Sequence, residues 1–110
     1  MIQNISTLEE LHSLIGTGSP IIVDMWAPWC GPCRTLAPIF DNSAQSNSDI
    51  IYVKVDVEAA PEVAGHFSVR GIPTLLGFSN NELKLRSPGS AATLSHMVDV
   101  VRKASIDAEF

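Results

Sequence analysis

The feature that most constrains the fold of this sequence is a pair of cysteines at the junction between a buried strand and a helix. The apolar run at 21–26 predicts a buried strand, and the apolar spacing that begins at Leu36 predicts a helix. Cys30 and Cys33, the only cysteines of the 110 residues, lie between these two segments. Because a three-residue spacing on one helical turn brings the two sulfurs together, the junction predicts a dithiol that opens and closes a disulfide.

Strand patterns and helix patterns alternate along the chain. Strands are predicted at 2–5, 21–25, 50–56, 74–78 and 82–86. Asn80–Asn81 predicts the hairpin turn between the last two strands, since asparagine tolerates left-handed backbone geometry. Strands that alternate with helices need parallel crossovers, whereas a hairpin adds an antiparallel pair. We therefore predict an α/β fold with a mixed central sheet of about five strands flanked by four helices, in a single domain over residues 1–110.

The helix patterns carry their own start and break signals. Ser6 and Glu9 form a capping-box pattern before the first helix, and Ser90 is placed to cap the last one. Pro61 suits the first turn of a short third helix. Pro38 lies inside the helix that follows the cysteines, where a proline produces a kink. These signals place the helices between the predicted strands.

The charge and hydropathy of the chain exclude two classes of partner. The net charge is −5 and the seven basic residues are scattered, whereas nucleic-acid binding needs clustered Lys and Arg. No apolar run approaches the roughly 18 residues of a membrane span. Residues 1–4 lack the basic region of a signal peptide, and no apolar segment of that kind follows them. We therefore expect a cytoplasmic protein with no nucleic-acid or membrane partner. We also expect it to be a monomer.

A structural role for the cysteine pair is disfavoured. A disulfide that closes a loop of about four residues stabilises a fold by roughly 2 kcal/mol at most, and structural disulfides are rare in reducing compartments. A zinc site needs four ligands, yet the three histidines are scattered. Haem attachment needs a histidine directly after the second cysteine, where this chain has Arg34. An inert buried pair is the remaining alternative, but a Gly-Pro spacer at a helix start is a poor place to bury thiols.

The start of the helix distinguishes the two cysteines chemically. Cys30 is predicted at or just before the N-cap, and Pro32 at the first helical position. The free N–H groups and the positive dipole end favour a thiolate there, so we expect a lowered pKa for Cys30 and a nucleophilic role. Cys33 lies inside the helix and should be less exposed. It suits the second step, in which it resolves the mixed disulfide that Cys30 forms with a substrate.

Asp24 interrupts the apolar strand just upstream of the cysteines. Because burial raises the pKa of a carboxyl group, Asp24 is a candidate to accept and return the proton of Cys33, directly or through a water. Lys54 supplies a cation on the neighbouring predicted strand and would tune this carboxyl group. The alternatives are an ordinary acid at a strand end and a solvated lysine.

Pro73 stands at the start of the fourth predicted strand, after Gly71 and Ile72. A proline at a strand start often marks a cis bond, and cis bonds are nearly confined to proline. We therefore predict a cis peptide bond before Pro73. A trans turn proline is the alternative.

These segments together resemble the thioredoxin family. Residues 24–33, with an intact Gly31–Pro32 dipeptide, are similar to the family's active-site segment, and the similarity covers about residues 5–103. Further matches are the helix-kinking Pro38, the third-strand segment 54–56, the cis-proline loop 70–74 and Gly89 before the last helix.

The resemblance implies a thiol-disulfide oxidoreductase, namely a general reductase of protein disulfides that a thioredoxin reductase reduces again. NADPH would be used only indirectly, and no cofactor would be bound besides the redox-active Cys30–Cys33 disulfide. An apolar groove around Cys30 would bind disulfide-containing protein substrates, with the substrate chain added as a strand beside Pro73. By position in the family, the groove residues are Trp29, Gly71, Ile72, Pro73 and Gly89. Pro73 would also form a wall against the sulfurs and keep metals out, so no metal site is expected.

The sequence departs from the family pattern at single positions. Met25 replaces a usual Phe, which is a tolerable core exchange, and Arg34 replaces a usual Lys with its charge kept. Asn81 replaces a turn glycine. Gly77 stands where a bulky aliphatic residue is usual, so its strand is expected to be weaker or bulged. Pro88 removes a backbone donor at the groove edge, which bears on the choice of partner and not on the redox step.

Two other functions fit the same resemblance. The first is an oxidase or isomerase of the same fold, because the dipeptide between the cysteines tunes the potential, and about 30 mV corresponds to roughly 1.4 kcal/mol for two electrons. Such relatives more often carry a histidine where this chain has Gly31–Pro32. The second is a non-catalytic binding module that uses the groove as a subunit surface. The intact Gly-Pro dipeptide favours the reductase.

Overall fold

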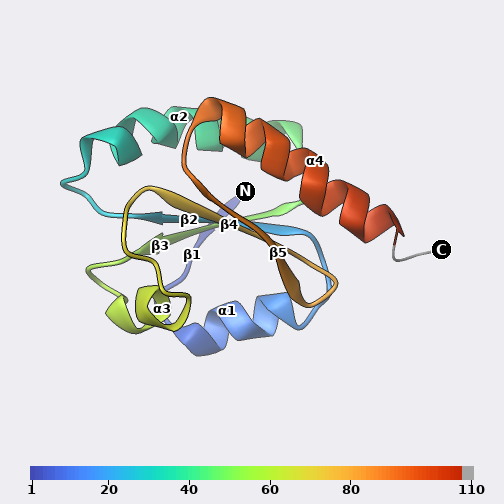
Figure 1. Ribbon diagram of the computed structural model, residues 1–110, viewed down its shortest axis with the longest axis horizontal. Helices are drawn as coiled ribbons and strands as arrows, with labels where there is room; N and C mark the ends of the chain where they lie inside the picture. The colour runs from blue at the N-terminus through green and yellow to red at the C-terminus, as the bar shows by residue number, and fades with distance from the viewer. Residues whose placement is uncertain (108–110) are drawn as a thin grey trace.

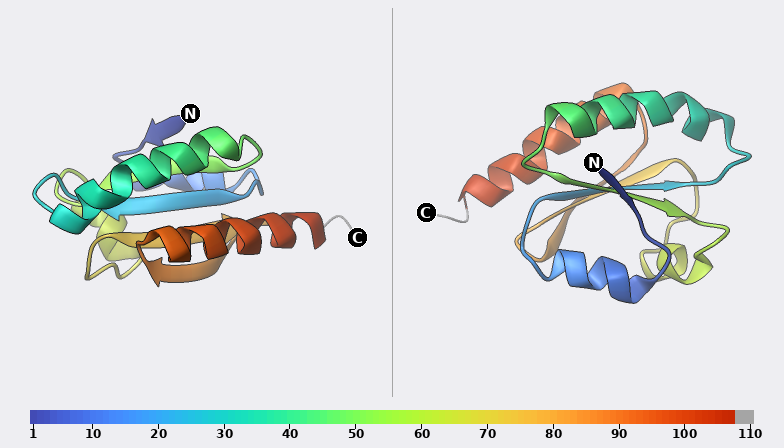
Figure 2. Two further views of the ribbon diagram at one scale, coloured as in Figure 1. Left: turned by 90° about the horizontal axis from the view of Figure 1, so that it is seen from above. Right: turned by 180° about the vertical axis from the view of Figure 1, so that it is seen from behind.

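The protein is described by a computed structural model of residues 1–107. A five-stranded mixed sheet, with strand order β1-β3-β2-β4-β5, lies between two layers of helices (Figures 1 and 2). The elements in chain order are β1 (Ile2–Asn4), α1 (Leu8–Ile15), β2 (Ile21–Trp26), α2 (Gly31–Ser46), β3 (Ile51–Asp56), α3 (Pro61–His66), β4 (Thr74–Ser79), β5 (Glu82–Pro88) and α4 (Ala91–Asp107). The predicted α/β fold with a mixed sheet flanked by helices is confirmed.

The pairing of the strands places the end of β2 beside the start of β4. β1 and β2 both pair with β3 in parallel, whereas β4 pairs with β2 and with β5 in antiparallel orientation. Met25, near the end of β2, lies opposite Thr74, the first residue of β4. The loop that follows β2 and the loop that precedes β4 therefore meet at one end of the sheet.

Successive side chains of each strand point to opposite faces of the sheet, and each face carries its own apolar core. The core that contains Val23 also contains Leu11 of α1 and Val63 of α3. The core that contains Ile22 also contains Phe40 of α2 and several residues of α4. The helices accordingly lie in two pairs, α1 with α3 on one face and α2 with α4 on the other (Figures 1 and 2).

The first helix is capped one residue later than its sequence pattern predicts. Thr7 is the N-cap of α1, and its Oγ1 accepts a hydrogen bond from the N–H of Glu10 at 3.1 Å. The Glu10 carboxylate accepts in turn from the N–H of Thr7 at 3.2 Å. The predicted box of Ser6 and Glu9 is therefore wrong, because the overlapping Thr7–Glu10 pair has the same spacing and is the one that closes.

The β4–β5 hairpin turns at Asn80 and Asn81, as predicted. Both residues have left-handed backbone geometry, with φ of 55° and 68°, which suits a two-residue hairpin turn. Gly77 pairs with Leu85 and Phe78 with Leu83, so the ladder is irregular at this point and the extra residue, Lys84, belongs to β5. The irregularity therefore lies opposite Gly77, in the partner strand, and not in β4 as the sequence predicts. β5 continues beyond its predicted end to Pro88, since an edge strand tolerates a proline.

The last helix, α4, begins at the predicted cap. The Ser90 Oγ lies 3.1 Å from the N–H of Thr93 and accepts its hydrogen bond. The sequence shows no clear pattern over 106–110, yet α4 continues to Asp107, and 108–110 lie outside the described residues. Over residues 1–107, no helix is both long and apolar enough to cross a membrane.

Gly77 allows α4 to pack closely on β4. A Cβ atom at this position would lie 2.8 Å from Cγ1 of Val101 and 2.9 Å from Cγ of Met97. Real Cβ atoms essentially never approach so closely, so a side chain here would move the helix or its side chains. The close approach explains a glycine where the family resemblance predicts a bulky aliphatic residue.

We predict that Gly77→Ala destabilises the protein by about 1–3 kcal/mol, because the added methyl group overpacks the β4–α4 contact. Urea unfolding followed by circular dichroism measures the change. Gly65→Ala in α3 is the matched control, since nothing lies within 4 Å of its added Cβ and alanine favours a helix by about 0.5–1 kcal/mol over glycine. Equal stability of the two variants would contradict the close packing.

Candidate active site

Cys30 and Cys33 form a disulfide at the start of α2. Cys30 is the N-cap residue, and its Sγ accepts the N–H of Cys33 at 3.2 Å. α2 begins at Gly31, so Pro32 occupies the second helical position and not the predicted first one. Neither position needs its N–H for a bond within the helix. The sulfur of Cys30 therefore lies where backbone N–H groups and the helix dipole favour negative charge.

Both cysteines are almost completely enclosed. Cys30 is 4% exposed and Cys33 is 2% exposed. They pack together with the buried Ala27, and Trp26 and Ile72 border the cluster. The expected difference in exposure between the two cysteines is therefore small in the disulfide form. Within residues 1–107, no group of three or more His, Cys, Asp or Glu side chains is placed to hold a metal ion.

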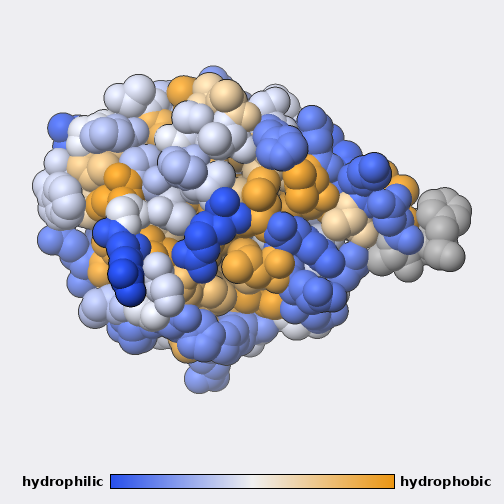
Figure 3. All heavy atoms as spheres, in the orientation of Figure 1, coloured by the Kyte–Doolittle hydropathy of each residue, from blue (hydrophilic) through white to orange (hydrophobic). Residues whose placement is uncertain are grey.

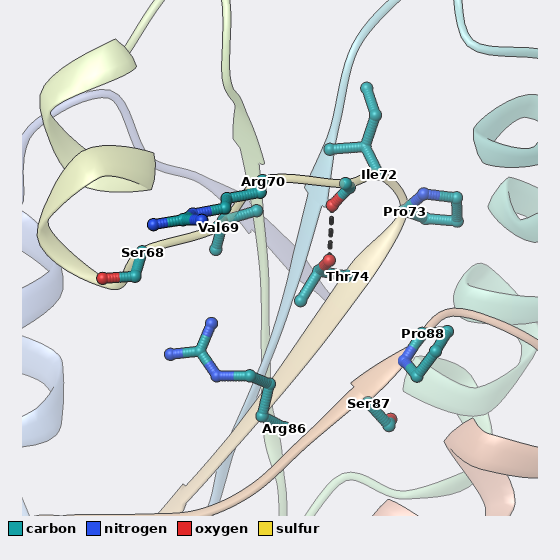
Figure 4. A pocket seen from close by; sticks show the side chains of 10 residues that line it. Ser68, Val69, Arg70, Ile72, Pro73, Thr74, Arg86, Ser87 and Pro88 are labelled. Carbon is teal, nitrogen blue, oxygen red and sulfur yellow. Dashed lines mark hydrogen bonds between the residues drawn. The ribbon is translucent and has the colours of Figure 1, made fainter.

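The loop before β4 lies directly against the disulfide. The Cys30 Sγ is 3.9 Å from the carbonyl oxygen of Ile72, and the Ile72–Pro73 peptide bond is cis, the geometry predicted from the sequence. The Thr74 hydroxyl donates a hydrogen bond to the carbonyl of Gly71, which closes the loop on itself (Figure 4). The backbone around Pro73 is thus held beside the sulfur that the sequence predicts to be nucleophilic.

Gly89 brings the end of β5 onto the same loop. Its N–H donates to the carbonyl of Pro73 at 2.9 Å. A Cβ atom on Gly89 would lie 2.8 Å from Cδ2 of Leu36 and 2.9 Å from Cβ of Pro73. Only a residue without a side chain fits between α2 and the cis-proline, which explains a glycine at this point of the chain.

The predicted groove residues differ in exposure. Trp29 is 63% exposed, Gly71 is exposed, and Ile72 and Pro73 are half-buried. Two hollows flank Pro73 and Gly89. One, of about 440 Å³, lies between residues 68–74 and the end of β5, and the other, of about 420 Å³, lies between α2 and residues 89–91.

Asp24 is a buried carboxyl group with no hydrogen-bond partner. It is 0% exposed, and neither of its side-chain oxygens has a partner among the described residues. Removal from water raises the pKa of Asp24 from 3.8 to about 6, and the positive charge of Lys54 opposes part of that rise. The side chain therefore carries a proton far more readily than an ordinary aspartate does.

Lys54 lies opposite Asp24 in the pairing of β2 with β3. Its Nζ is 4.7 Å from the centre of the Trp26 ring, which is a cation–π distance. Trp26 is two residues from Asp24 and so lies on the same face of β2. Asp24, Trp26 and Lys54 therefore lie on one face of the sheet. The sequence analysis missed Trp26 as a contact of Lys54, although the two-residue alternation of a strand predicts it.

The sequence profile of the Thioredoxin family matches residues 4–103. The chain belongs to the thioredoxin family. It is 39% identical over 82 residues to a thioredoxin of Mycoplasmoides gallisepticum, and the matched segment covers 74% of this chain and 82% of that protein. It is 42% identical over 101 residues to a chloroplastic M-type thioredoxin of Pisum sativum, covering 89% of this chain and 58% of that protein. The X-ray structure of Fasciola hepatica thioredoxin superposes with a TM-score of 0.86 at 30% identity, over 90% of this chain and 98% of that chain.

Family membership and the disulfide at the start of α2 establish the class of chemistry. The chain is a thiol-disulfide oxidoreductase that acts on proteins, and the Cys30–Cys33 disulfide is its redox-active group. The resemblance to thioredoxin drawn from the sequence is confirmed. The individual roles of Asp24, Lys54 and Pro73 stay predictions.

We predict that Asp24→Asn stabilises the protein at neutral pH. Because folding raises the pKa of Asp24, the folded protein holds this proton more tightly than the unfolded chain, and stability falls as the pH rises from 3.8 to about 6. Above that pH range, burial of the ionised carboxylate lowers the free energy of unfolding by about 3 kcal/mol. Urea unfolding of wild type and Asp24→Asn from pH 4 to pH 8 should show a gain of this order at pH 7 that shrinks towards pH 4.

Asp41→Asn, a change at an exposed aspartate of α2, is the control and should show no such gain. A pH-independent difference between Asp24→Asn and wild type would contradict the buried, proton-binding carboxyl group.

Proposed function

We propose that this thioredoxin-family protein is a general reductase of protein disulfides. The observation that carries the proposal is the position of the Cys30 sulfur, at the N-cap of α2 and 3.9 Å from the carbonyl oxygen beside the cis-proline. A thiolate there is favoured by the helix start and lies next to backbone that a substrate chain can pair with. The Gly31–Pro32 dipeptide supports reduction as the direction of the reaction.

The first step is attack by Cys30. In the dithiol form, the Cys30 thiolate attacks one sulfur of a substrate disulfide, so that a mixed disulfide forms and the other substrate sulfur leaves as a thiolate. The substrate chain would lie in the groove formed by Trp29, Gly71, Ile72, Pro73 and Gly89, with its backbone added beside the loop that precedes β4. Pro73 has no side-chain ligand and forms a wall beside the sulfurs.

The second step is resolution by Cys33. Cys33 gives its proton to Asp24, directly or through a water, and the resulting thiolate attacks the Cys30 sulfur. The remaining substrate sulfur leaves and takes up a proton, which Asp24 returns. The substrate has then gained two electrons, and the Cys30–Cys33 disulfide is formed. A pKa of about 6 leaves Asp24 ionised at pH 7 and able to accept the proton, and Lys54 supports the ionised form.

A further reductant must return the disulfide to the dithiol. We propose a thioredoxin reductase, which would pass two electrons from NADPH to the Cys30–Cys33 disulfide, so that NADPH is used only indirectly. We place the reaction in the cytoplasm, a reducing compartment, and expect the protein to work as a monomer. A relative from Pisum sativum is a chloroplastic protein, so fractionation of the source cells is the check on this location.

We predict that the wild-type protein, supplied with NADPH and a thioredoxin reductase, reduces insulin, and that Cys30→Ser abolishes the reaction. Cys33→Ser should instead accumulate a covalent adduct with the substrate, because attack by Cys30 proceeds and resolution does not. Insulin turbidity measures the first outcome, and non-reducing electrophoresis measures the second. Adducts with Cys30→Ser and none with Cys33→Ser would reverse the assigned roles, and an inactive wild type with several reductases would contradict the proposed function.

A further inference from the structure

The larger hollow beside the cis-proline has a lining that the redox step does not use. It is an open hollow of about 440 Å³ between the loop of residues 68–74 and the end of β5. Ile72 belongs to its lining, and the Ile72 carbonyl oxygen is 3.9 Å from the Cys30 Sγ. One end of the hollow therefore lies next to the reacting sulfur.

Two arginines are the only ionisable side chains among the described residues that line this hollow. Arg70 comes from the loop after α3, and Arg86 comes from β5 (Figure 4). Neither takes part in the ion pairs found over residues 1–107, which join Lys84 to Glu82 and Arg102 to Asp49. The hollow thus collects two unpaired positive charges in a chain whose net charge is −5.

Arg86 is held in place at the hollow. Its guanidinium donates a hydrogen bond to the carbonyl of Phe67, which joins β5 to the segment after α3. Figure 4 shows the Arg86 side chain extending from β5 towards the loop that carries Ser68 and Arg70. A guanidinium has five N–H donors, so this bond leaves others free. Because the side chain is already ordered, a further bond costs it less conformational entropy.

The rest of the lining suits a polypeptide. Ile72, Pro73 and Pro88 contribute apolar surface to the hollow. Because Pro88 has no backbone N–H, it adds no hydrogen-bond donor to this lining. The space-filling view shows apolar groups alternating with strongly hydrophilic ones on the face that carries the β4–β5 hairpin (Figure 3). A bound segment with apolar atoms and one negative charge matches this lining.

We propose that the hollow receives an acidic side chain of the bound polypeptide, held by Arg70 and Arg86, so that the protein prefers disulfides with a Glu or Asp near the reacting cysteine. The inference rests on the proposed function, because it needs a substrate chain beside Pro73. Carboxylates match the guanidinium fork in charge and geometry. In an extended chain, the side chains two residues on either side of the cysteine lie roughly 7 Å from it. The Ile72 carbonyl oxygen, at the near end of the hollow, is 3.9 Å from the Cys30 Sγ.

The test uses synthetic peptides with one cysteine activated as a 2-pyridyl disulfide, in an otherwise alanine-based sequence. Glu, Gln or Lys stands two residues before or two residues after the cysteine. The reduced protein attacks the activated disulfide, and release of 2-thiopyridone gives the rate. We expect at least one of the two Glu peptides to react faster than its Gln peptide by about two- to fivefold, the range of one exposed ion pair, and the matching Lys peptide to react more slowly.

High salt and two arginine variants test whether the preference for Glu arises from the charges of Arg70 and Arg86. At 1 M NaCl, where the screening length is about 3 Å, the ratio of Glu to Gln rates should approach one. Arg70→Gln and Arg86→Gln should each lower this ratio at low salt. Lys103→Gln removes a charge from an exposed position of α4 and is the matched control, which should keep the full ratio. The wild-type peptide and salt comparisons need no variant, so they hold even where Arg86→Gln unfolds.

The outcomes separate the two proposals. Fast reaction with equal Glu and Gln rates, or a preference that both arginine variants keep, overturns the acidic-side-chain inference and leaves the reductase intact. Rates no faster than those of dithiothreitol for every peptide, together with no reduction of insulin, contradict the proposed function itself.

Discussion

The antiparallel pairing of β2 with β4 is the constraint on which the site depends. The cysteine turn follows β2 and the cis-proline loop precedes β4, so this pairing alone brings the two segments to the same end of the sheet. Contacts between the loops then refine the fit. Gly89 lies between Leu36 and Pro73 and donates its N–H to Pro73, and the Cys30 sulfur comes to rest beside the Ile72 carbonyl. If β2 and β4 did not pair, these contacts between the two loops would be lost although the residues themselves were unchanged.

Asp24 is an ionisable group that the fold keeps buried at a cost in stability. The carboxyl group is buried without a hydrogen-bond partner. Its removal from water raises its pKa, and the positive charge of Lys54 cancels only part of that rise. The Lys54 ammonium group lies over the Trp26 ring, so the lysine acts on Asp24 through the field of its charge. In the proposed mechanism, this arrangement leaves the carboxylate ionised at pH 7 and able to bind a proton during the second step. The apolar cores on both faces of the sheet supply the stability that the buried charge removes.

Much of this fold follows from local pattern, and the remainder depends on contacts between distant segments. Strand alternation and the Asn80–Asn81 turn predict the sheet, and the cysteine junction predicts the start of α2. The cap of α1 shows the limit of local pattern, because Ser6–Glu9 and Thr7–Glu10 have identical spacing and only the structure distinguishes them. The bond from Arg86 to the Phe67 carbonyl joins residues 19 apart in the chain, and no sequence signal marks it. The reason for Gly77 is likewise visible only once α4 lies on β4.

The reduction potential of the Cys30–Cys33 pair tests the central claim most directly, because it decides in which direction electrons flow. Equilibration against known ratios of reduced and oxidised dithiothreitol or glutathione, followed by thiol trapping, gives this value. A protein-disulfide reductase should lie at about −270 mV, at which it donates electrons to most accessible protein disulfides. A potential of about −180 mV, in the range of disulfide isomerases, would contradict the account.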